Sequence, residues 1–155
     1  SSVYYLGEAW VADGSAVLFQ RAGEMTSITL MTAAGDLINR TEDYNFARFA
    51  FSANWSPTGE RIALGGRNGQ CPYGLIVMTG DLSIVSSANP PPTACDPVFS
   101  PDGVWIAYSG INPRIDGRLD LYVANANGYS AFNVTAQLRG QIRILGWVGG
   151  ITPPA

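Results

Sequence analysis

The stretch FSPDGVWIAYSG, Phe99 to Gly110, decides the fold because the chain contains it in three versions. WSPTGERIALGG begins at Trp55, and WVADGSAVLFQ begins at Trp10. The opening aromatic residues are therefore 45 and 44 residues apart. Self-similarity at a spacing of roughly 40 to 50 residues is typical of propellers and solenoids, which are built from repeated units.

Each version begins with a turn that suits a β-hairpin. In residues 100–103 (SPDG), proline presets φ, the serine hydroxyl can hydrogen-bond to the turn backbone, and glycine takes the left-handed conformation that closes the hairpin. The second version, SPTG, lacks only the aspartate, whereas the first keeps only the Asp-Gly pair. We therefore expect a hairpin turn at all three places.

Short apolar runs follow each turn and predict strands. The two runs of each unit are Val17–Phe19 and Ile28–Met31, then Ile62–Leu64 and Leu75–Met78, then Ile106–Tyr108 and Leu121–Ala124. These runs are apolar on both faces, which is typical of strands that lie between neighbouring sheets. A second turn, at Gly35, Gly80 or Gly128, precedes a more polar run, such as Leu37–Thr41 or Ala131–Thr135. Four antiparallel strands about every 45 residues predict the blade of a β-propeller.

We therefore expect one all-β domain over residues 1–150, made of three four-stranded β-propeller-type blades plus one extra strand, and a tail over residues 151–155. The blades are expected at about 3–41, 46–87 and 95–135, and the extra strand, at 141–148, would open a fourth blade. Closed propellers have roughly four to eight blades, so this chain is expected to be a partial propeller.

The repeated phrases resemble a known family. WSPTGERIAL and FSPDGVWIAY, followed by LYVANANG and a strand that ends in NVT, are similar to the repeat of TolB-like β-propeller proteins. The same type of repeat occurs beside peptidase domains in dipeptidyl-peptidase-type enzymes. The resemblance covers about 140 of the 155 residues and implies the fold, whereas propellers support many unrelated activities. The first unit departs most, because its turn lacks both Ser and Pro.

An incomplete ring leaves an apolar blade face and an unpaired edge exposed. The chain can be part of a longer propeller, two copies can join as halves of a six-bladed ring, or copies can stack blade to blade in an open assembly. We expect assembly through the exposed blade faces, so a second copy of the chain is one candidate partner.

The composition argues against catalysis and against anionic partners. The chain has no His, and all nine of its cations are Arg, so the commonest general bases and amine nucleophiles are missing. The nucleophile pattern G-x-S-x-G is also absent. We predict no enzyme activity, no cofactor and no metal site. A net charge of −3 without a basic run disfavours nucleic acid, and no apolar run approaches the roughly 18 residues of a membrane span.

The two cysteines, Cys71 and Cys95, are too far apart for a CxxC redox site, and no His is present to complete a zinc site. We expect a disulfide between two successive loops, which indicates an extracytoplasmic protein: periplasmic, on the cell surface or secreted. The alternative is two free thiols, one or both of them buried as small apolar side chains.

Propeller topology places the connections between units, and those between each unit's second and third strands, on one side. We call this side the loop face and the side with the hairpin turns the turn face. Irregular loops on a rigid scaffold commonly bind partners. The candidate residues for binding a protein or peptide are Arg67, Tyr73, Asp96, Arg114, Asp116 and Arg118. Arg side chains can bind carboxylates with a fork of donors, and the alternative is that these charges pair among themselves.

Three N-x-S/T sequons begin at Asn39, Asn54 and Asn133, and we interpret them as products of the repeat rather than as glycosylation sites. The sequence thus favours a non-catalytic extracytoplasmic propeller module for protein–protein interaction or assembly. One alternative is a structural subunit of an extracellular ring or filament. Another is a fragment of the regulatory propeller of a larger peptidase-type protein.

Overall fold

The computed structural model describes residues 4–10, 13–22, 27–41, 51–87 and 92–147. Within these residues the chain forms thirteen β-strands and no helix. The strands are β1 (Tyr4–Trp10), β2 (Ala16–Ala22), β3 (Ser27–Thr32), β4 (Leu37–Arg40), β5 (Phe51–Trp55), β6 (Arg61–Gly66), β7 (Tyr73–Gly74), β8 (Ile76–Thr79), β9 (Ile84–Ser87), β10 (Thr93–Phe99), β11 (Trp105–Ile111), β12 (Leu119–Asn125) and β13 (Phe132–Asn133).

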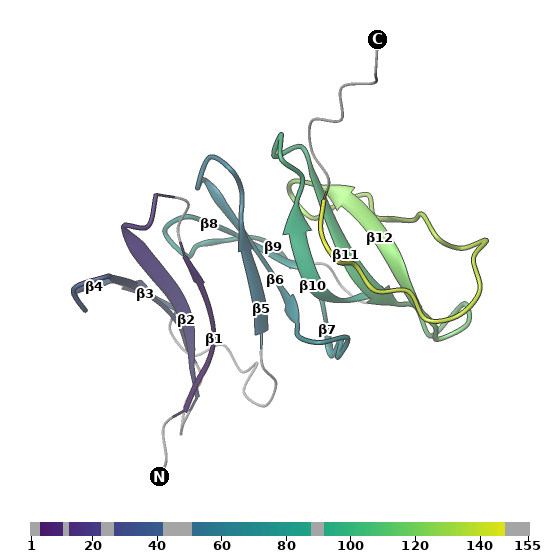
Figure 1. Cartoon of the computed structure of the whole chain (residues 1–155), viewed down its shortest axis with the longest axis horizontal. Helices are drawn as coiled ribbons and strands as arrows, with labels where there is room; N and C mark the ends of the chain where they lie inside the picture. The colour runs from purple at the N-terminus through teal and green to yellow at the C-terminus, as the bar shows by residue number, and fades with distance from the viewer. Residues whose placement is uncertain (1–3, 11–12, 23–26, 42–50, 88–91, 148–155) are drawn as a thin grey trace.

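Three antiparallel blades stand side by side in chain order (Figure 1). Blade 1 has the order β1-β2-β3-β4, and blade 3 has the order β10-β11-β12-β13. Blade 2 consists of β5, β6, β8 and β9, each paired antiparallel with the next. The prediction of an all-β, partial β-propeller is confirmed.

A short extra strand, β7, links blade 2 to blade 3. It lies in the connection between β6 and β8 and pairs with β10 of blade 3. Cys95 of β10 also bridges to Gly66 of β6 in parallel. The connection after β6 folds back closely on Gly66, since a Cβ at this position would lie 1.7 Å from the carbonyl oxygen of Gln70. Blades 2 and 3 are therefore one continuous nine-stranded sheet.

The hairpin turns have the predicted chemistry. The Ser100 hydroxyl accepts a hydrogen bond from the backbone N–H of Trp105 at 3.0 Å, and Ser56 accepts one from Arg61 at the same distance. The turn glycines of the three units have φ values between +73° and +74°. Because these conformations favour glycine, the repeated Gly is a backbone requirement of each turn.

Two apolar layers fill the spaces between the blades. The layer between blades 1 and 2 contains Ala16, Leu18, Ile28, Leu30, Phe51, Ile62, Leu64, Ile76, Met78 and Leu82. The layer between blades 2 and 3 contains Ala63, Leu75, Val77, Ala94, Phe99, Ile106, Tyr108, Tyr122 and Ala124. Blade 2 contributes to both layers, so its strands are apolar on both faces, as the sequence predicts.

The prediction of an extra strand at 141–148 is wrong. Residues 141–147 belong to no strand, and residue 148 lies outside the described residues. The segment nevertheless runs along blade 3: the N–H of Ile144 donates to the Ser109 hydroxyl at 2.9 Å, and the Trp147 indole donates to the carbonyl of Val98 at 3.0 Å. It forms no ladder because the described residues contain no second strand of a fourth blade with which it could pair.

The expected loop around the second cysteine is also wrong, because β10 begins at Thr93. Cys95 therefore lies in a strand and is fully buried. A long strand forms here because its residues pair with Ser109–Ile111 on one side and with β7 on the other. The first residue of the expected blade 1, residues 46–50 of the expected blade 2 and the tail at 151–155 lie outside the described residues.

We expect Gly66→Ala to lower the free energy of unfolding by about 3 kcal/mol or more, because the new methyl group would overlap backbone atoms that cannot move away. Gly117→Ala is the matched control. Its φ is +64° with open space around the position, so the cost is only about 1 kcal/mol of backbone strain. Urea denaturation measures both. Equal losses for the two variants would contradict the close approach of the β6–β8 connection to Gly66.

Candidate functional site

All six predicted binding residues lie on the loop face of blades 2 and 3, but the structure divides them into two groups. Tyr73 is in β7, Asp96 is in β10, and the other four follow β6 or β11. Tyr73, Asp96 and Arg118 are engaged in contacts within the chain, whereas Arg67, Arg114 and Asp116 are exposed.

Asp96 holds a neighbouring loop in place. It lies at a β-bulge between Cys95 and Val98, with a positive φ of 51°. Its two carboxylate oxygens accept hydrogen bonds from the backbone N–H groups of Asn68 and Gly69, both at 2.9 Å. The Arg143 guanidinium lies 3.6 Å from the same carboxylate. Asp96 therefore positions the loop after β6 and the segment after blade 3.

Arg118 belongs to a buried polar network centred on Asp120. The Asp120 side chain is only 2% exposed, and one of its oxygens accepts hydrogen bonds from Arg118 at 2.7 Å and from the Thr135 hydroxyl at 3.0 Å. Its other oxygen accepts the side-chain amide of Asn133 at 2.9 Å. Burial acts to raise the pKa of Asp120, but the hydrogen bonds outweigh it, so this pKa lies below its ordinary value.

The same Arg118 guanidinium connects two segments of the loop face. It donates to the carbonyl of Leu138, in the segment after β13, and its Nε atom lies 3.7 Å from the Asp116 carboxylate. Arg118 thus pairs with Asp116 and Asp120, as the alternative interpretation of the sequence stated, whereas Arg114 is exposed. Arg118 is a positioning residue of the loop face rather than a free binding group.

Tyr73 packs inside the chain. Its ring stacks on Phe51 with 6.1 Å between the ring centroids and 19° between the ring planes. It borders the apolar layer between blades 1 and 2, and β7 places it there. Its main contribution is therefore to the attachment of the β6–β8 connection.

The exposed part of the loop face contains residues that the sequence interpretation missed. Ile115, at the tip of the β11–β12 connection, is 71% exposed, and Leu138 is 54% exposed. We call Arg114, Ile115, Leu138 and Arg139 the loop-face patch. Arg118, in the same connection as Arg114 and Ile115, donates to the Leu138 carbonyl and so links the two segments of the patch. The only feature of the sequence that could have indicated this patch is an isoleucine inside an otherwise polar loop.

The tip that carries Arg114 and Ile115 is held in one conformation by Asn112. The Asn112 carbonyl accepts hydrogen bonds from the N–H groups of Ile115 and Gly117, both at 3.1 Å. Its side-chain oxygen accepts the N–H of Arg114 at 3.1 Å. An exposed apolar side chain on an ordered tip costs little entropy to bury against a partner.

The sequon asparagines connect structural units. The side-chain oxygen of Asn54, in blade 2, accepts the backbone N–H of Phe99, in blade 3, at 2.8 Å. The Asn133 amide is bonded to Asp120, and the Asn39 amide donates to the carbonyl of Asp81 in blade 2. The amide nitrogen that a glycan would modify is therefore engaged at Asn39 and Asn133.

The predicted disulfide is present between Cys71 and Cys95. It ties the connection after β6 to the first strand of blade 3. In the described part of the chain, no group of three or more His, Cys, Asp or Glu side chains is arranged to hold a metal ion. No helix long and apolar enough to cross a membrane occurs among the described residues.

The fold is similar to solved structures of TolB. A protein from Agrobacterium tumefaciens assigned as TolB matches with a TM-score of 0.58 and 19% identity, over 83% of this chain and 45% of that one. TolB from Acinetobacter baumannii matches with a TM-score of 0.56 and 14% identity, over 84% and 32%. A eukaryotic initiation factor also matches, with a TM-score of 0.60 and 14% identity, over 84% and 32%.

The chain therefore spans less than half the length of each of these three structures. No protein-family model matches the chain, and no curated protein matches it in sequence. Because an initiation factor and two TolB proteins match about equally well, the similarity establishes the propeller fold and leaves the activity to the residues of this chain.

We expect Asp120→Asn to lower the free energy of unfolding by about 3 kcal/mol, because it leaves the Arg118 charge without its buried partner. Asp116→Asn, at a carboxylate that is 44% exposed, is the control and should cost at most about 0.5 kcal/mol. Because the pKa of Asp120 is lowered by folding, its stabilisation is present above about pH 4 and is lost as the pH falls through the lower, folded-state value.

Urea denaturation between pH 7 and pH 2 measures both effects. The original chain should lose stability below about pH 4, and Asp120→Asn should lose less over the same range. An unchanged pH dependence in Asp120→Asn would show that this carboxylate does not contribute to acid unfolding.

Proposed function

We propose that the chain is a non-catalytic protein-interaction module that works outside the cytoplasm and binds a partner through the loop-face patch. The observation that carries this proposal is the ordered tip formed by Arg114 and Ile115. Asn112 fixes its backbone, and Arg118 anchors the neighbouring Leu138 segment. An apolar anchor surrounded by arginines on a rigid scaffold is a common composition of a protein-binding surface.

The charge of this region favours an acidic partner. The described loop-face connections of blades 2 and 3 carry five arginines (Arg67, Arg114, Arg118, Arg139 and Arg143) and one aspartate, Asp116, while Asp96 and Asp120 lie in the adjoining strands β10 and β12. The whole chain, by contrast, has a net charge of −3. Two of the aspartates, Asp96 and Asp120, are engaged in holding loops. The exposed charge is thus mainly positive and suits a surface rich in carboxylates.

The Cys71–Cys95 disulfide supports a location outside the cytoplasm, because cytoplasmic thiols are kept reduced. The absence of His from the whole chain supports a non-catalytic role. The two tyrosines of the blade 3 core, Tyr108 and Tyr122, also offer no acid or base near neutral pH, since burial raises the pKa of each.

Fluorescence anisotropy with a short labelled peptide of glutamates around two leucines tests the loop-face patch. We expect the double variant Arg114→Glu, Arg139→Glu to weaken binding by about tenfold or more, and Ile115→Ser to weaken it by about threefold or more. Arg40→Glu, an exposed charge reversal at the loop-face end of blade 1, is the matched control. Equal weakening by the control, or no effect of Ile115→Ser, would contradict a specific patch.

A second candidate function is assembly through the blade faces, and the repeat supports it. Leu18 and Leu30 of blade 1 face blade 2, and the equivalent Ala63 and Val77 of blade 2 face blade 3. The equivalent residues of blade 3 are Ala107 and Val123, which share a face with Phe132. The segment that contains Ile144 lies against part of this face, where Ala107 and Ser109 are buried, and no described blade covers the rest of it. At the other end of the row, the face of blade 1 that points away from blade 2 is also apolar. In blade 2, the equivalent face packs against blade 1 through Ile62, Leu64 and Met78. The repeat places Val17, Phe19 and Met31 at these positions of blade 1.

Blade 3 therefore presents the kind of face that blade 1 can cover in a second copy. Such a contact is heterologous, because two different surfaces meet, and it can close a ring or continue as an open stack. The exposed aromatic residues of blade 3, Trp105 and Phe132, would be buried there. A blade-on-blade contact of this kind would repeat the packing that already joins the three blades.

Native mass at several concentrations tests assembly. We expect species of at least twice the chain mass, and we expect Val123→Asp to remove them by placing a charge in the contact. Ile115→Asp, at the loop tip and away from the blade faces, should leave them unchanged. Thermal melts show whether Val123→Asp still folds. A folded original chain that is monomeric at all concentrations would contradict assembly without affecting the loop-face proposal.

A further inference from the structure

Residues 141–147, after blade 3, occupy the place that the first strand of a fourth blade would take; we call them the capping segment. The first strands of the three blades lie next to one another, since β1 contacts β5 and β5 contacts β10. The capping segment continues this series, because the Trp147 indole donates to the carbonyl of Val98, in β10, at 3.0 Å. In the repeat, Trp147 aligns with the aromatic residues that end the first strands, Trp10, Trp55 and Phe99.

One position of the repeat contacts the next unit in all three blades. In blade 1 it is Gln20, whose side chain accepts the N–H of Phe51, in β5, at 2.9 Å. In blade 2 it is Gly65, where an added Cβ would lie 3.1 Å from a backbone oxygen of β10. In blade 3 it is Ser109, whose hydroxyl accepts the N–H of Ile144 at 2.9 Å. The capping segment therefore meets blade 3 as β5 meets blade 1 and as β10 meets blade 2.

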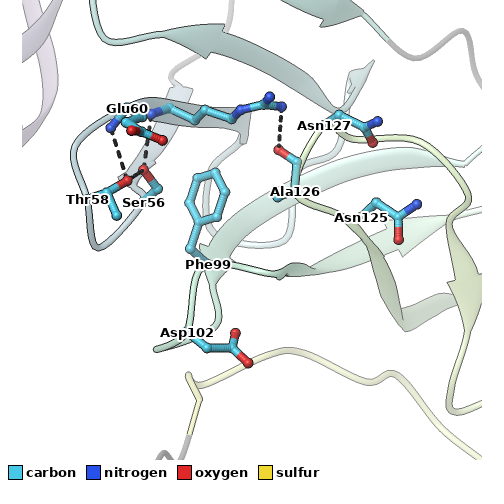
Figure 2. A pocket seen from close by; sticks show the side chains of 10 residues that line it. Ser56, Thr58, Glu60, Phe99, Asp102, Asn125, Ala126 and Asn127 are labelled. Carbon is cyan, nitrogen blue, oxygen red and sulfur yellow. Dashed lines mark hydrogen bonds between the residues drawn. The ribbon is translucent and has the colours of Figure 1, made fainter.

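The capping segment lacks the cover that a first strand receives from its own blade. Phe99 ends β10 and is only 7% exposed, in the layer between blades 2 and 3. Figure 2 shows its ring between the blade 2 turn that bears Ser56 and the blade 3 turn that bears Asn125. Trp147, at the equivalent position, is 36% exposed, because the described residues contain no further blade to cover it. The capping segment thus has the position of a first strand without the rest of a blade.

Single contacts, rather than a ladder, attach the capping segment to the chain. The N–H of Ile142 donates to the carbonyl of Leu119 at 2.7 Å, and the Gln141 side chain accepts the N–H of Leu119 at 2.8 Å. The other contacts described for the segment are the hydrogen bonds of Ile144 and Trp147 and the Arg143–Asp96 ion pair. By contrast, β1 pairs with β2 from residue 4 to residue 10. Separating the capping segment from blade 3 therefore breaks fewer bonds than separating β1 from blade 1.

We propose that the capping segment is an autoinhibitory contact, which limits blade-on-blade assembly by occupying the place of β1 of a second copy. The inference rests on the assembly proposed above, in which blade 1 of one copy covers blade 3 of another. If these blades stack as the blades within the chain do, β1 of the second copy lies beside β10, where Ile144 and Trp147 lie in the single chain.

Two first strands cannot occupy one place, so one of them must leave before blade 1 can dock on blade 3. The capping segment is the one that leaves, because β1 is held by its ladder with β2. The association constant of the chain is then its intrinsic value multiplied by the fraction of chains whose capping segment is released. Weakening the attachment of the segment raises this fraction without changing either docking surface.

Sedimentation equilibrium at several concentrations tests the capping segment with the variant Ile144→Pro. This variant lacks the N–H that donates to Ser109, so we expect its association constant to exceed that of the original chain by about tenfold or more. Leu145→Pro is the matched control, because Leu145 is fully exposed and its N–H has no partner among the described residues. It should change the association constant by less than about twofold. Thermal melts show whether both variants fold.

Val123→Asp, added to Ile144→Pro, identifies the surface that associates, and it should remove the gain if that surface is the outer face of blade 3. The inference is overturned if Leu145→Pro strengthens association as much as Ile144→Pro, or if the double variant still associates. Association of the original chain with no gain in Ile144→Pro would exclude autoinhibition and leave blade-face assembly standing. A folded Ile144→Pro variant that is monomeric at all concentrations, like the original chain, would contradict both.

Discussion

The packing of one blade face on the next is the constraint on which the rest of the structure depends. Blade 2 is covered on both sides, and Ile62 on one face and Val77 on the other have no exposed surface. Apolar residues on both faces follow from this burial, and so does the need for small residues where strands of different blades meet. At Gly65, a Cβ would lie 3.1 Å from the carbonyl oxygen of Ala94 in the next blade.

Close packing of the blades also buries backbone N–H groups, and side-chain oxygens accept their hydrogen bonds. The first strand of each unit lies against the previous unit with backbone N–H groups that need partners once buried. The Gln20 side chain accepts the N–H of Phe51, and the Asn54 side chain accepts the N–H of Phe99. Ser109 does the same for Ile144, so the segment after blade 3 lies where a further first strand would lie, although it forms no ladder.

Local chemistry was predictable from the sequence, whereas contacts between distant segments were not. The SPDG turns depend on residues within five positions of one another, so their geometry could be read directly. Asp96 was expected to be a binding residue, but its partners are Asn68 and Gly69 in the preceding blade. The left-handed position in the second turn of blade 2 is taken by Leu82, not by Gly80, because burial of Leu82 in the layer next to blade 1 offsets the backbone strain.

The packing of blade on blade also determines which surfaces of the chain remain exposed. The blade faces that meet one another are occupied by packing, so the two ends of the strands can vary in side chain without disturbing the two apolar layers. At one end, Asn112, Asp96 and Arg118 are used to hold connections in place, and the arginines around them remain exposed. At the other end, tight turns select Asp because its carboxylate bonds to the turn backbone, and the same carboxylates make that end acidic. The opposite charges of the two ends are thus a consequence of how each end is built.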